Sequence, residues 1–264
     1  MRVLLIGDIV GKGGRRAVKQ FAPLLREEYG CEFCIANAEN AAGGAGITEK
    51  CALELKNAQV DVITLGDHVW DQKEFAQQID GLPFVVRPAN FSGKQPGRGH
   101  VVMELPGGAK ICVINAIGRV FVGANSDCPF TKVEEIIKKE MAAGCKTFFV
   151  DFHGEATSEK IAMGRFLDGR ATAVWGTHTH VQTADEQIYP GGTAFLCDIG
   201  MVGSRESILG RDIKAVVHKF YTGMPRRFTV VETDTMLCGA VVDFNPATGR
   251  ASAIQRIVRY MPNS

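Results

Sequence analysis

A pair of histidines near residue 180 is the first place in this sequence where chemistry could be concentrated. Residues 175–183 are WGTHTHVQT, so His178 and His180, two of the six histidines of the chain, are separated by one threonine. Residues two apart on an extended chain share one face, and imidazole nitrogen is a common metal ligand. Because H-x-H also occurs by chance on surfaces, the pair indicates a metal only if other ligands lie nearby.

Candidate ligands do follow the apolar segments of this chain. Five segments that are predicted to be β-strands each end in a carboxylate, an amide or an imidazole. In open α/β sheets the ligand site lies beyond the carboxyl ends of the strands, so we expect these side chains to meet there. They are Asp8, Glu39, Asn40, Asp67, His68, His153, His178 and His180.

Single members of this set have ordinary structural interpretations. Asp8 could cap the helix that follows it, Glu39 could be a solvated or paired carboxylate, and His153 could be a hydrogen-bonded core histidine. Their joint occurrence at strand ends favours a metal site over these separate interpretations. His100 and His218 are not accompanied by other candidate ligands at a strand end, and we interpret them as structural.

The types of ligand restrict the metal. Carboxylate, imidazole and amide without thiolate suit Fe, Mn, Zn or Co rather than an iron–sulfur cluster or copper(I). Without His68 the set still holds seven groups, which is too many for one ion. Two ions about 3.5–4 Å apart, bridged by a carboxylate and a hydroxide, would use all of them. The two histidines of the H-x-H pattern could then serve one ion each.

The elements that must position these residues are predicted to form a single domain over residues 1–264. No low-complexity stretch, linker or repeat divides the chain, and its 45% apolar and 22% charged residues are typical of a globular protein. The first part alternates between strands and helices, which implies a parallel sheet covered on both faces. The strands are 2–8, 32–40 and 60–68, and the helices are 15–29, 48–58 with Thr48 as cap, and 71–79.

The second part is richer in strands. A hairpin is predicted over 100–116 around the residues PGG at 106–108, and the tail is predicted to be antiparallel with a turn at 245–249. The whole is therefore expected to be an α/β fold in which two mixed β-sheets pack together with helices outside. The other predicted elements are helices 131–143 and 157–169 and strands 145–155, 171–180, 226–232, 235–244 and 250–260.

Composition excludes several classes of function. The net charge of +1 gives no basic face for long nucleic acid, and no apolar stretch approaches the roughly 18 residues of a membrane span. The apolar run at the start is broken by Gly7 and Asp8, so we expect no signal peptide and a cytoplasmic protein. The eight cysteines are scattered through apolar segments, which predicts free thiols. The phosphate-loop, dinucleotide and G-x-S-x-G patterns are absent.

At this point the motifs resemble a known family. The order of ligands resembles the calcineurin-like metallophosphoesterases, and over essentially the whole chain the sequence is similar to their YmdB-like branch. The phrases that carry this resemblance are LLIGDIVG, NAENAAGG, TLGDHVWD, RPANF, GRVF, VDFHGEATSEK and GTHTHVQTAD, in that order.

The resemblance implies a metallophosphoesterase that hydrolyses 2′,3′-cyclic nucleotides with two Fe or Mn ions. It implies attack by a metal-bound hydroxide, with His68 protonating the leaving group. It assigns Glu39 as a bridge between two ions. One ion would also take Asp8, Asn40 and His180, and the other Asp67, His153 and His178.

Two positions depart from the family patterns. The broad superfamily begins D-x-H, but Val10 stands at the third position here, so the resemblance assigns the missing ligand to Asn40. The branch usually has Asn where this chain has Asp67, which adds one negative charge to the second site. We expect this charge to alter metal preference rather than to abolish activity.

Two other functions remain open from the sequence. One is a broad-specificity phosphatase or nuclease of the same fold, and the other is a regulatory nucleotide-binding protein that retains metals with little turnover. In each case the expected partner is a small molecule, with a homo-oligomer possible and neither a membrane nor long nucleic acid involved.

Overall fold

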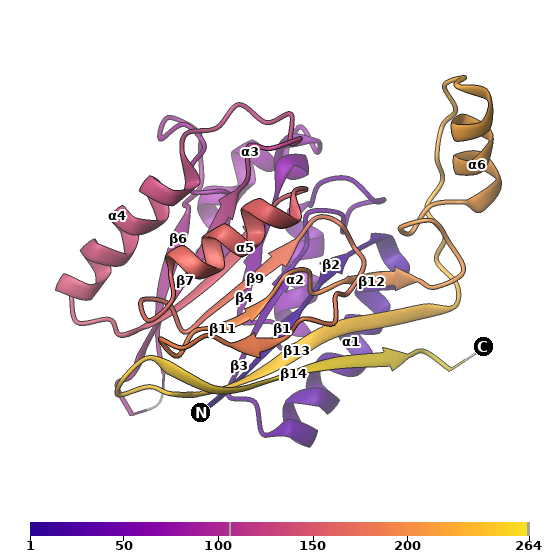
Figure 1. The fold of residues 1–264 in the computed structure, drawn as a ribbon. Helices are drawn as coiled ribbons and strands as arrows, with labels where there is room; N and C mark the ends of the chain where they lie inside the picture. Colours follow the sequence, from indigo (N-terminus) through magenta and orange to yellow (C-terminus); the bar gives the residue numbers. More distant parts are fainter. Residues whose placement is uncertain (106, 263–264) are drawn as a thin grey trace.

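Two β-sheets packed face to face make up the body of the protein (Figure 1). The computed structural model describes residues 1–105 and 107–262. The first sheet has eight strands, in the order β2-β12-β13-β1-β3-β4-β5 with β14 beside β13, and the second has six, in the order β10-β11-β9-β8-β7-β6. Both contain parallel and antiparallel pairs, so the prediction of two mixed sheets is confirmed.

The first sheet is built from the predicted strand–helix alternation. Its parallel part pairs β1 with β3, β3 with β4 and β4 with β5. The side chain of Thr48 accepts a hydrogen bond from the backbone N–H of Cys51, so the predicted helix cap is confirmed. The elements are β1 (Arg2–Ile6), α1 (Gly11–Tyr29), β3 (Phe33–Asn37), α2 (Glu49–Asn57), β4 (Val62–Thr64), α3 (Phe75–Gln78) and β5 (Val85–Val86).

The helix predicted over 71–79 is shorter than expected. Only α3 is α-helical there, and single 3₁₀ turns, η1 (Asp67–Trp70) and η2 (Ile79–Gly81), precede and follow it. The strands predicted over 32–40 and 60–68 also end earlier, at Asn37 and Thr64. Their polar residues therefore lie in the turns beyond the strands, where side chains are free to turn towards a ligand.

The C-terminal hairpin completes the first sheet. Strand β13 (Thr235–Asn245) pairs antiparallel with β14 (Arg250–Tyr260), as predicted, and also with β1. The short strands β12 (Met201–Ser204) and β2 (Asp8–Ile9) extend the same sheet. The N-terminal strand is thus enclosed by segments from both ends of the chain (Figure 1).

The second sheet contains the predicted hairpin at 100–116, whose strands pair antiparallel; Pro106 of its turn lies outside the described residues. Strands β7, β8 and β9 are parallel neighbours. His153 at the end of β8 contacts Glu39 and Asp67, which follow strands of the first sheet, so the carboxyl ends of both sheets lie at one edge. The elements are β6 (His100–Glu104), β7 (Lys110–Ile117), α4 (Pro129–Ala142), β8 (Thr147–His153), α5 (Thr157–Phe166), β9 (Ala173–Thr177), β10 (Gln187–Ile188) and β11 (Ala194–Leu196).

The apolar core has three parts, as the layered arrangement requires. Leu5, Ile35, Val113, Phe149 and Trp175 belong to the part between the two sheets, where they are fully or almost fully buried. A second part lies under α1, α2 and α3, and a third under α4 and α5. Helices therefore cover the outer face of each sheet, as predicted (Figure 1).

Residues 205–232, which we call the arm, depart from the predicted pattern. The strand predicted over 226–232 does not form, and Val230 makes only an isolated bridge to Arg211. An apolar, β-branched stretch becomes a strand only when a neighbouring strand offers its backbone groups. Residues 226–232 instead follow helix α6 (Ile213–Thr222) and lead back from it towards the sheets (Figure 1). Figure 1 shows α6 standing away from the two sheets.

Two sequence expectations about the whole chain can be compared with the structure. All eight cysteines are free, and seven of them are buried, as their apolar surroundings predicted. In the described part of the chain, no helix combines the length and the apolar character needed to cross a membrane.

Candidate metal centre

The candidate ligands come from both sheets and meet at their common carboxyl edge. The first sheet supplies oxygen atoms: Asp8 begins β2, Glu39 and Asn40 follow β3, and Asp67 begins the 3₁₀ turn after β4. The second sheet supplies nitrogen atoms. His153 is the last residue of β8, and His178 and His180 follow β9.

One group of donors combines two carboxylates with two imidazoles. Glu39, Asp67, His153 and His178 each offer an atom, and these atoms all lie within 4.8 Å of one another. Nε2 of His153 lies 3.2 Å from Oε1 of Glu39 and 3.1 Å from Oδ1 of Asp67. Nδ1 of His178 lies 3.0 Å from the same Nε2.

A second group shares Glu39 with the first. Asp8, Glu39 and His180 offer atoms that also lie within 4.8 Å of one another. Asn40 is next to this group, because its Oδ1 lies 3.1 Å from Nε2 of His180. All seven side chains that the sequence suggested as ligands are therefore close together, in two groups joined by one carboxylate. Their role as metal ligands stays a prediction.

Asp8 does not cap the following helix. The residue before α1 is Val10, and no side chain caps that helix end. The carboxylate of Asp8 is fully buried and instead accepts hydrogen bonds from the backbone N–H of His178, at 3.3 Å to each oxygen. This contact ties the start of β2 to the segment that carries the histidine pair.

The histidine pair is not on an extended strand, contrary to the expectation for 171–180. Strand β9 ends at Thr177, and His178 and His180 have left-handed φ values of 92° and 65°. The two side chains therefore do not share a strand face, and each joins a different donor group. Such backbone costs on the order of 1–3 kcal/mol per residue, so the surrounding structure must hold it.

Asp198 holds the segment between the two histidines. Its Oδ2 accepts hydrogen bonds from the hydroxyl of Thr179 at 2.6 Å and from the backbone N–H of Thr179 at 3.2 Å. The buried ammonium of Lys160 donates to the same oxygen at 2.8 Å and to the Thr179 hydroxyl at 2.9 Å. Sequence reasoning missed this network, because neither Lys160 nor Asp198 has a spacing that points to the pair.

His153 is supported from behind by a second buried network. Its Nδ1 lies 2.9 Å from the hydroxyl of Thr177, and that hydroxyl donates to Oδ1 of Asp151 at 2.7 Å. Asn37 and Thr64 donate to the other oxygen of Asp151. A hydrogen bond on one ring nitrogen fixes the direction of the other, so Asp151 and Thr177 aim Nε2 of His153 at the donors. D-x-H in the segment VDFHGE was the available signal, and it was not used.

The electrostatics of the cluster favour a cation. Burial alone would lower the pKa of His153, but the charge of Glu39 and the hydrogen bond to Asp67 outweigh it and raise that pKa well above its usual value. Burial raises the pKa of Asp8 well above its usual value. The carboxylates thus recruit a proton onto His153, and a metal ion that binds there would replace that proton.

The other two imidazoles are already suited to ligation. Burial, reinforced by the charge of His153, lowers the pKa of His178, and burial lowers the pKa of His180 to about 4. Both rings are therefore neutral at neutral pH, and a metal requires a neutral imidazole. Sequence alone predicted the histidines but gave no protonation state.

The packing leaves room for ions where the donors converge. Gly66 precedes Asp67, and a Cβ atom at this position would lie 2.2 Å from Oε2 of Glu39 and 2.4 Å from Nε2 of His153. Any larger residue would displace these two donor atoms. A mixed oxygen and nitrogen donor set around a space that only glycine leaves open fits divalent transition-metal ions.

His68 lies beside the donor groups but belongs to neither of them. Its Nδ1 lies 2.8 Å from Oδ2 of Asp71, and the ring lines the pocket next to His178 and His180. Burial alone would lower the pKa of His68, but Glu39 and the hydrogen bond to Asp71 raise it. Asp71 was missed in the sequence, although one 3₁₀ turn places it three residues after His68.

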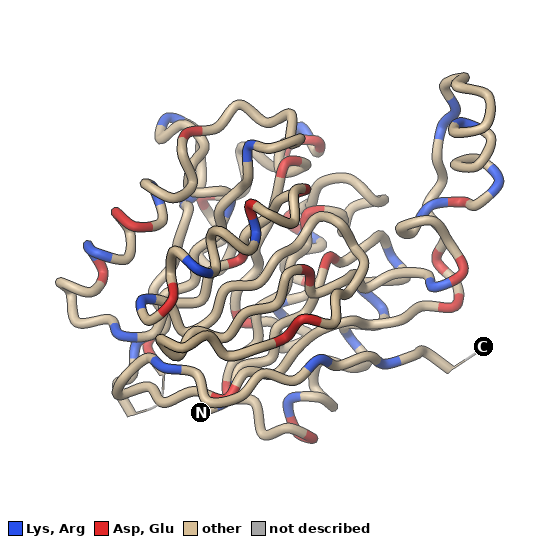
Figure 2. The backbone as a smooth tube through the Cα atoms, viewed as in Figure 1, with Lys and Arg blue, Asp and Glu red and all other residues tan. Residues whose placement is uncertain are grey.

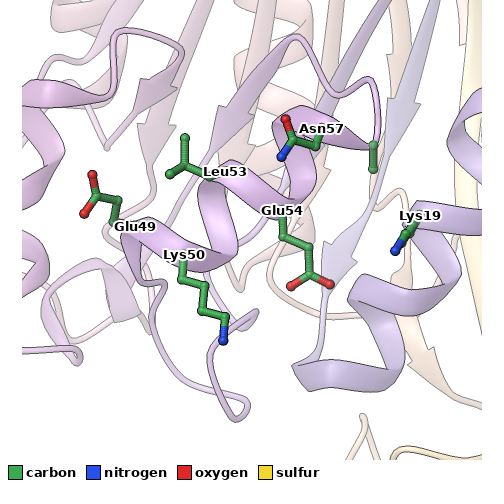
Figure 3. Close-up of a pocket in the computed structure, with 7 residues that line it drawn as sticks. Lys19, Glu49, Lys50, Leu53, Glu54 and Asn57 are labelled. Atoms are coloured by element: carbon green, nitrogen blue, oxygen red, sulfur yellow. The ribbon is translucent and has the colours of Figure 1, made fainter.

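A pocket of about 270 Å³ opens onto the two donor groups. Glu39, Asn40 and the three histidines line one side of it, and residues of the arm line the other. A larger groove of about 600 Å³ lies between α1 and α2, with Lys19, Glu49, Lys50 and Glu54 along it. Figure 3 shows that these charged groups lie apart and do not converge, so this groove is not the metal centre.

Known proteins are similar to this chain in sequence and fold. A Bacillus subtilis (strain 168) protein named 2′,3′-cyclic-nucleotide 2′-phosphodiesterase is 48% identical over 258 residues, which are 98% of this chain and 97% of that protein. A crystal structure described as a novel phosphatase of Mycoplasma pneumoniae has a TM-score of 0.92 and 33% identity, covering 98% of this chain and 93% of the other.

A further crystal structure, of a hypothetical protein from Thermus thermophilus, has a TM-score of 0.92 and 37% identity and covers 99% of this chain and all of that one. The predicted calcineurin-like metallophosphoesterase fold is thereby confirmed. Residues 4–257 match the family described as YmdB-like protein. The motifs predicted this relationship, and the chain belongs to the YmdB-like family.

Proposed function

We propose that this protein is a phosphodiesterase that opens 2′,3′-cyclic nucleotides and uses two divalent transition-metal ions, Fe or Mn before Zn or Co. The observation that carries the proposal is the pair of donor groups joined by Glu39. The name of the Bacillus subtilis relative supports the substrate class. When bound, the cations would stabilise negative charge on the phosphoryl group and lower the pKa of a coordinated water.

The charge of the cluster supports an anionic substrate. With metal bound, Asp8, Glu39 and Asp67 would contribute three negative charges, and two divalent ions would bring four positive ones. The two ions would thus more than offset the carboxylates, and a hydroxide would bring the sum to zero, so the loaded site would not repel the single negative charge of a phosphodiester. Two ions sharing one carboxylate would bring both of them to the same phosphoryl group.

His68 is proposed to donate a proton to the leaving oxygen. In the reaction a water molecule loses one proton to the solvent and its oxygen bonds to phosphorus. One phosphorus–oxygen bond to the ribose breaks, and the freed ribose oxygen takes the proton of His68, which the solvent then replaces. Asp71 holds Nδ1 of His68, which leaves Nε2 for the substrate. Because His68 lines the pocket without belonging to a donor group, it can hold a proton that a metal ligand could not.

An assay with three kinds of ester tests the proposal. The Mn²⁺-loaded protein is expected to convert 2′,3′-cyclic adenosine monophosphate to a nucleoside monophosphate, and to cleave bis-nitrophenyl phosphate faster than mono-nitrophenyl phosphate. A faster reaction with the monoester would favour a phosphatase instead, the activity that describes the Mycoplasma pneumoniae relative. Binding of the cyclic nucleotide without any turnover would favour a regulatory protein.

A further inference from the structure

The pocket beside the metal centre has a second wall that the proposed chemistry does not use. This wall belongs to the arm, and apart from one arginine its side chains are apolar. With about 270 Å³, the pocket is close to the lower limit of about 300 Å³ for small-molecule sites, which suits one mononucleotide rather than a polymer. The arm residues that line it are Ile208, Leu209, Arg211, Val216, Phe220 and Phe228.

Arg211 reaches from the arm to the donor groups. Its guanidinium donates a hydrogen bond to the carbonyl of Gly44, and the side-chain amide of Asn40 donates to the same oxygen at 3.3 Å. Among the described residues no carboxylate pairs with Arg211, and burial lowers its pKa. A half-buried cation without an acidic partner is costly, and an anion in the pocket would remove that cost.

Aromatic rings stand further along the same wall. Phe220 lines the pocket although 81% of its surface is exposed, and Phe228 is the other phenylalanine of the lining. A phenylalanine this exposed gains little from burial in the chain itself. Nucleobases stack on such rings whatever their sequence, because every base has a π-face.

The charge of the arm is opposite to that of the donor groups. Residues 205–232 contain six basic residues and three acidic residues. Figure 2 shows this basic segment projecting beside the body of the protein. Basic side chains around a pocket raise the local concentration of anions and speed their capture.

We propose that Arg211, Phe220 and Phe228 form the nucleotide subsite of this pocket. Arg211 pairs with a non-bridging phosphate oxygen, and Phe220 and Phe228 hold the base against the arm. The inference rests on the proposed function, since it names the part of the site that selects nucleotides among phosphodiesters. The subsite only binds the nucleotide, and no covalent bond forms or breaks there.

A substrate without a base tests the role of Phe220. Wild type and Phe220→Ala are compared on 2′,3′-cyclic adenosine monophosphate and on the base-free 2′,3′-cyclic phosphate of methyl riboside, with Mn²⁺ present. The variant is expected to lose about 5- to 150-fold in kcat/KM on the nucleotide, the range for one stacked base, and little on the base-free ester. Tyr221→Ala is the matched control, because Tyr221 is 91% exposed on the same helix and does not line the pocket.

The arginine is tested with the same two substrates. Arg211→Gln is expected to lose about 10- to 100-fold in kcat/KM on both, since both carry the phosphate and one charge-assisted hydrogen bond is removed. Arg205→Gln is its control, because Arg205 pairs with Asp234 at the base of the arm. The subsite is overturned if Phe220→Ala affects both substrates equally, or if Arg211→Gln behaves like Arg205→Gln.

A binding measurement separates this inference from the proposed function. Calorimetry with adenosine 3′-monophosphate on the Mn²⁺-loaded protein is expected to show weaker binding for Phe220→Ala and Arg211→Gln, but not for the two controls. If no variant turns over cyclic nucleotides and this binding pattern holds, the subsite stands and the phosphodiesterase proposal falls. If turnover occurs and binding does not depend on Phe220 or Arg211, the subsite falls alone.

Discussion

The two sheets contribute to the candidate metal centre in different ways. The first sheet supplies oxygen donors, from Asp8, Glu39, Asn40 and Asp67, and the second supplies only imidazoles. Neither donor group is complete within one sheet, since each contains at least one histidine and one carboxylate. The site therefore forms only when the two sheets pack, and the apolar layer between them is part of what assembles it.

Replacing Glu39 is expected to have the largest effect on the site, because Glu39 is the one donor common to both groups. Glu39→Gln is expected to bind fewer than one metal ion per chain and to lose about 10⁴-fold or more in kcat, since two bound cations supply several kcal/mol. Metal analysis and the cyclic-nucleotide assay measure both effects. Glu49→Gln is the control, and two retained ions in Glu39→Gln would contradict the bridge.

Replacing His68 separates chemistry from metal binding. His68→Ala is expected to keep its metals and to lose about 10²- to 10⁴-fold in kcat, the usual contribution of a general acid. Loss of metals together with activity would make His68 a ligand. Asp71→Asn should be milder. Because the Asp71 hydrogen bond raises the pKa of His68, its loss should move the alkaline limb of the pH–rate profile to lower pH.

Replacing His178 or His180 tests the contribution of the second sheet, which supplies the nitrogen donors. His178→Ala and His180→Ala are each expected to retain about one ion per chain, because each ring belongs to a different group. Losing one such electrostatic contact should cost about 10²- to 10³-fold in kcat. His218→Ala, on the exposed face of α6, is the control. Loss of both ions from either variant would show that the groups are not independent.

The smallest effect is expected from the charge of Asp67. Asp67→Asn removes one negative charge from the group that contains His153 and His178. A weaker hold on the ion should change the ratio of Fe to Mn bound from a mixture and change the rate a few-fold. Metal analysis of both proteins checks this, and identical metal content and rate would refute it.

Most of the site could be predicted because it follows strand ends. Parallel strands bring their carboxyl ends to one edge of a sheet, so Glu39 and Asp67 could be placed together without knowing which strands were neighbours. His153 joins them from the other sheet. What supports them could not be predicted in the same way. Asp198 and Asp151 act through hydrogen bonds to Thr179 and Thr177, and such contacts depend on packing rather than on spacing.

The arm marks the limit of pattern reasoning about the fold. Residues 226–232 have the composition of a strand, but they have no sheet to join and pair only at Val230. The histidine pair marks a second limit, since its alternation fits a strand while its backbone is left-handed. In each case the local sequence pattern fits a β-strand, but the surrounding chain does not permit one there.

The backbone of the histidine pair also bears on how this protein would evolve. Glycine adopts positive φ without strain, so a change of His178 or His180 to glycine would relieve the chain while removing a nitrogen donor. Pressure for heat resistance alone would thus tend to erase the pair, as expected where activity and stability oppose each other. Retention of both imidazoles in a descendant lineage would therefore be a sign of continued selection for what they bind.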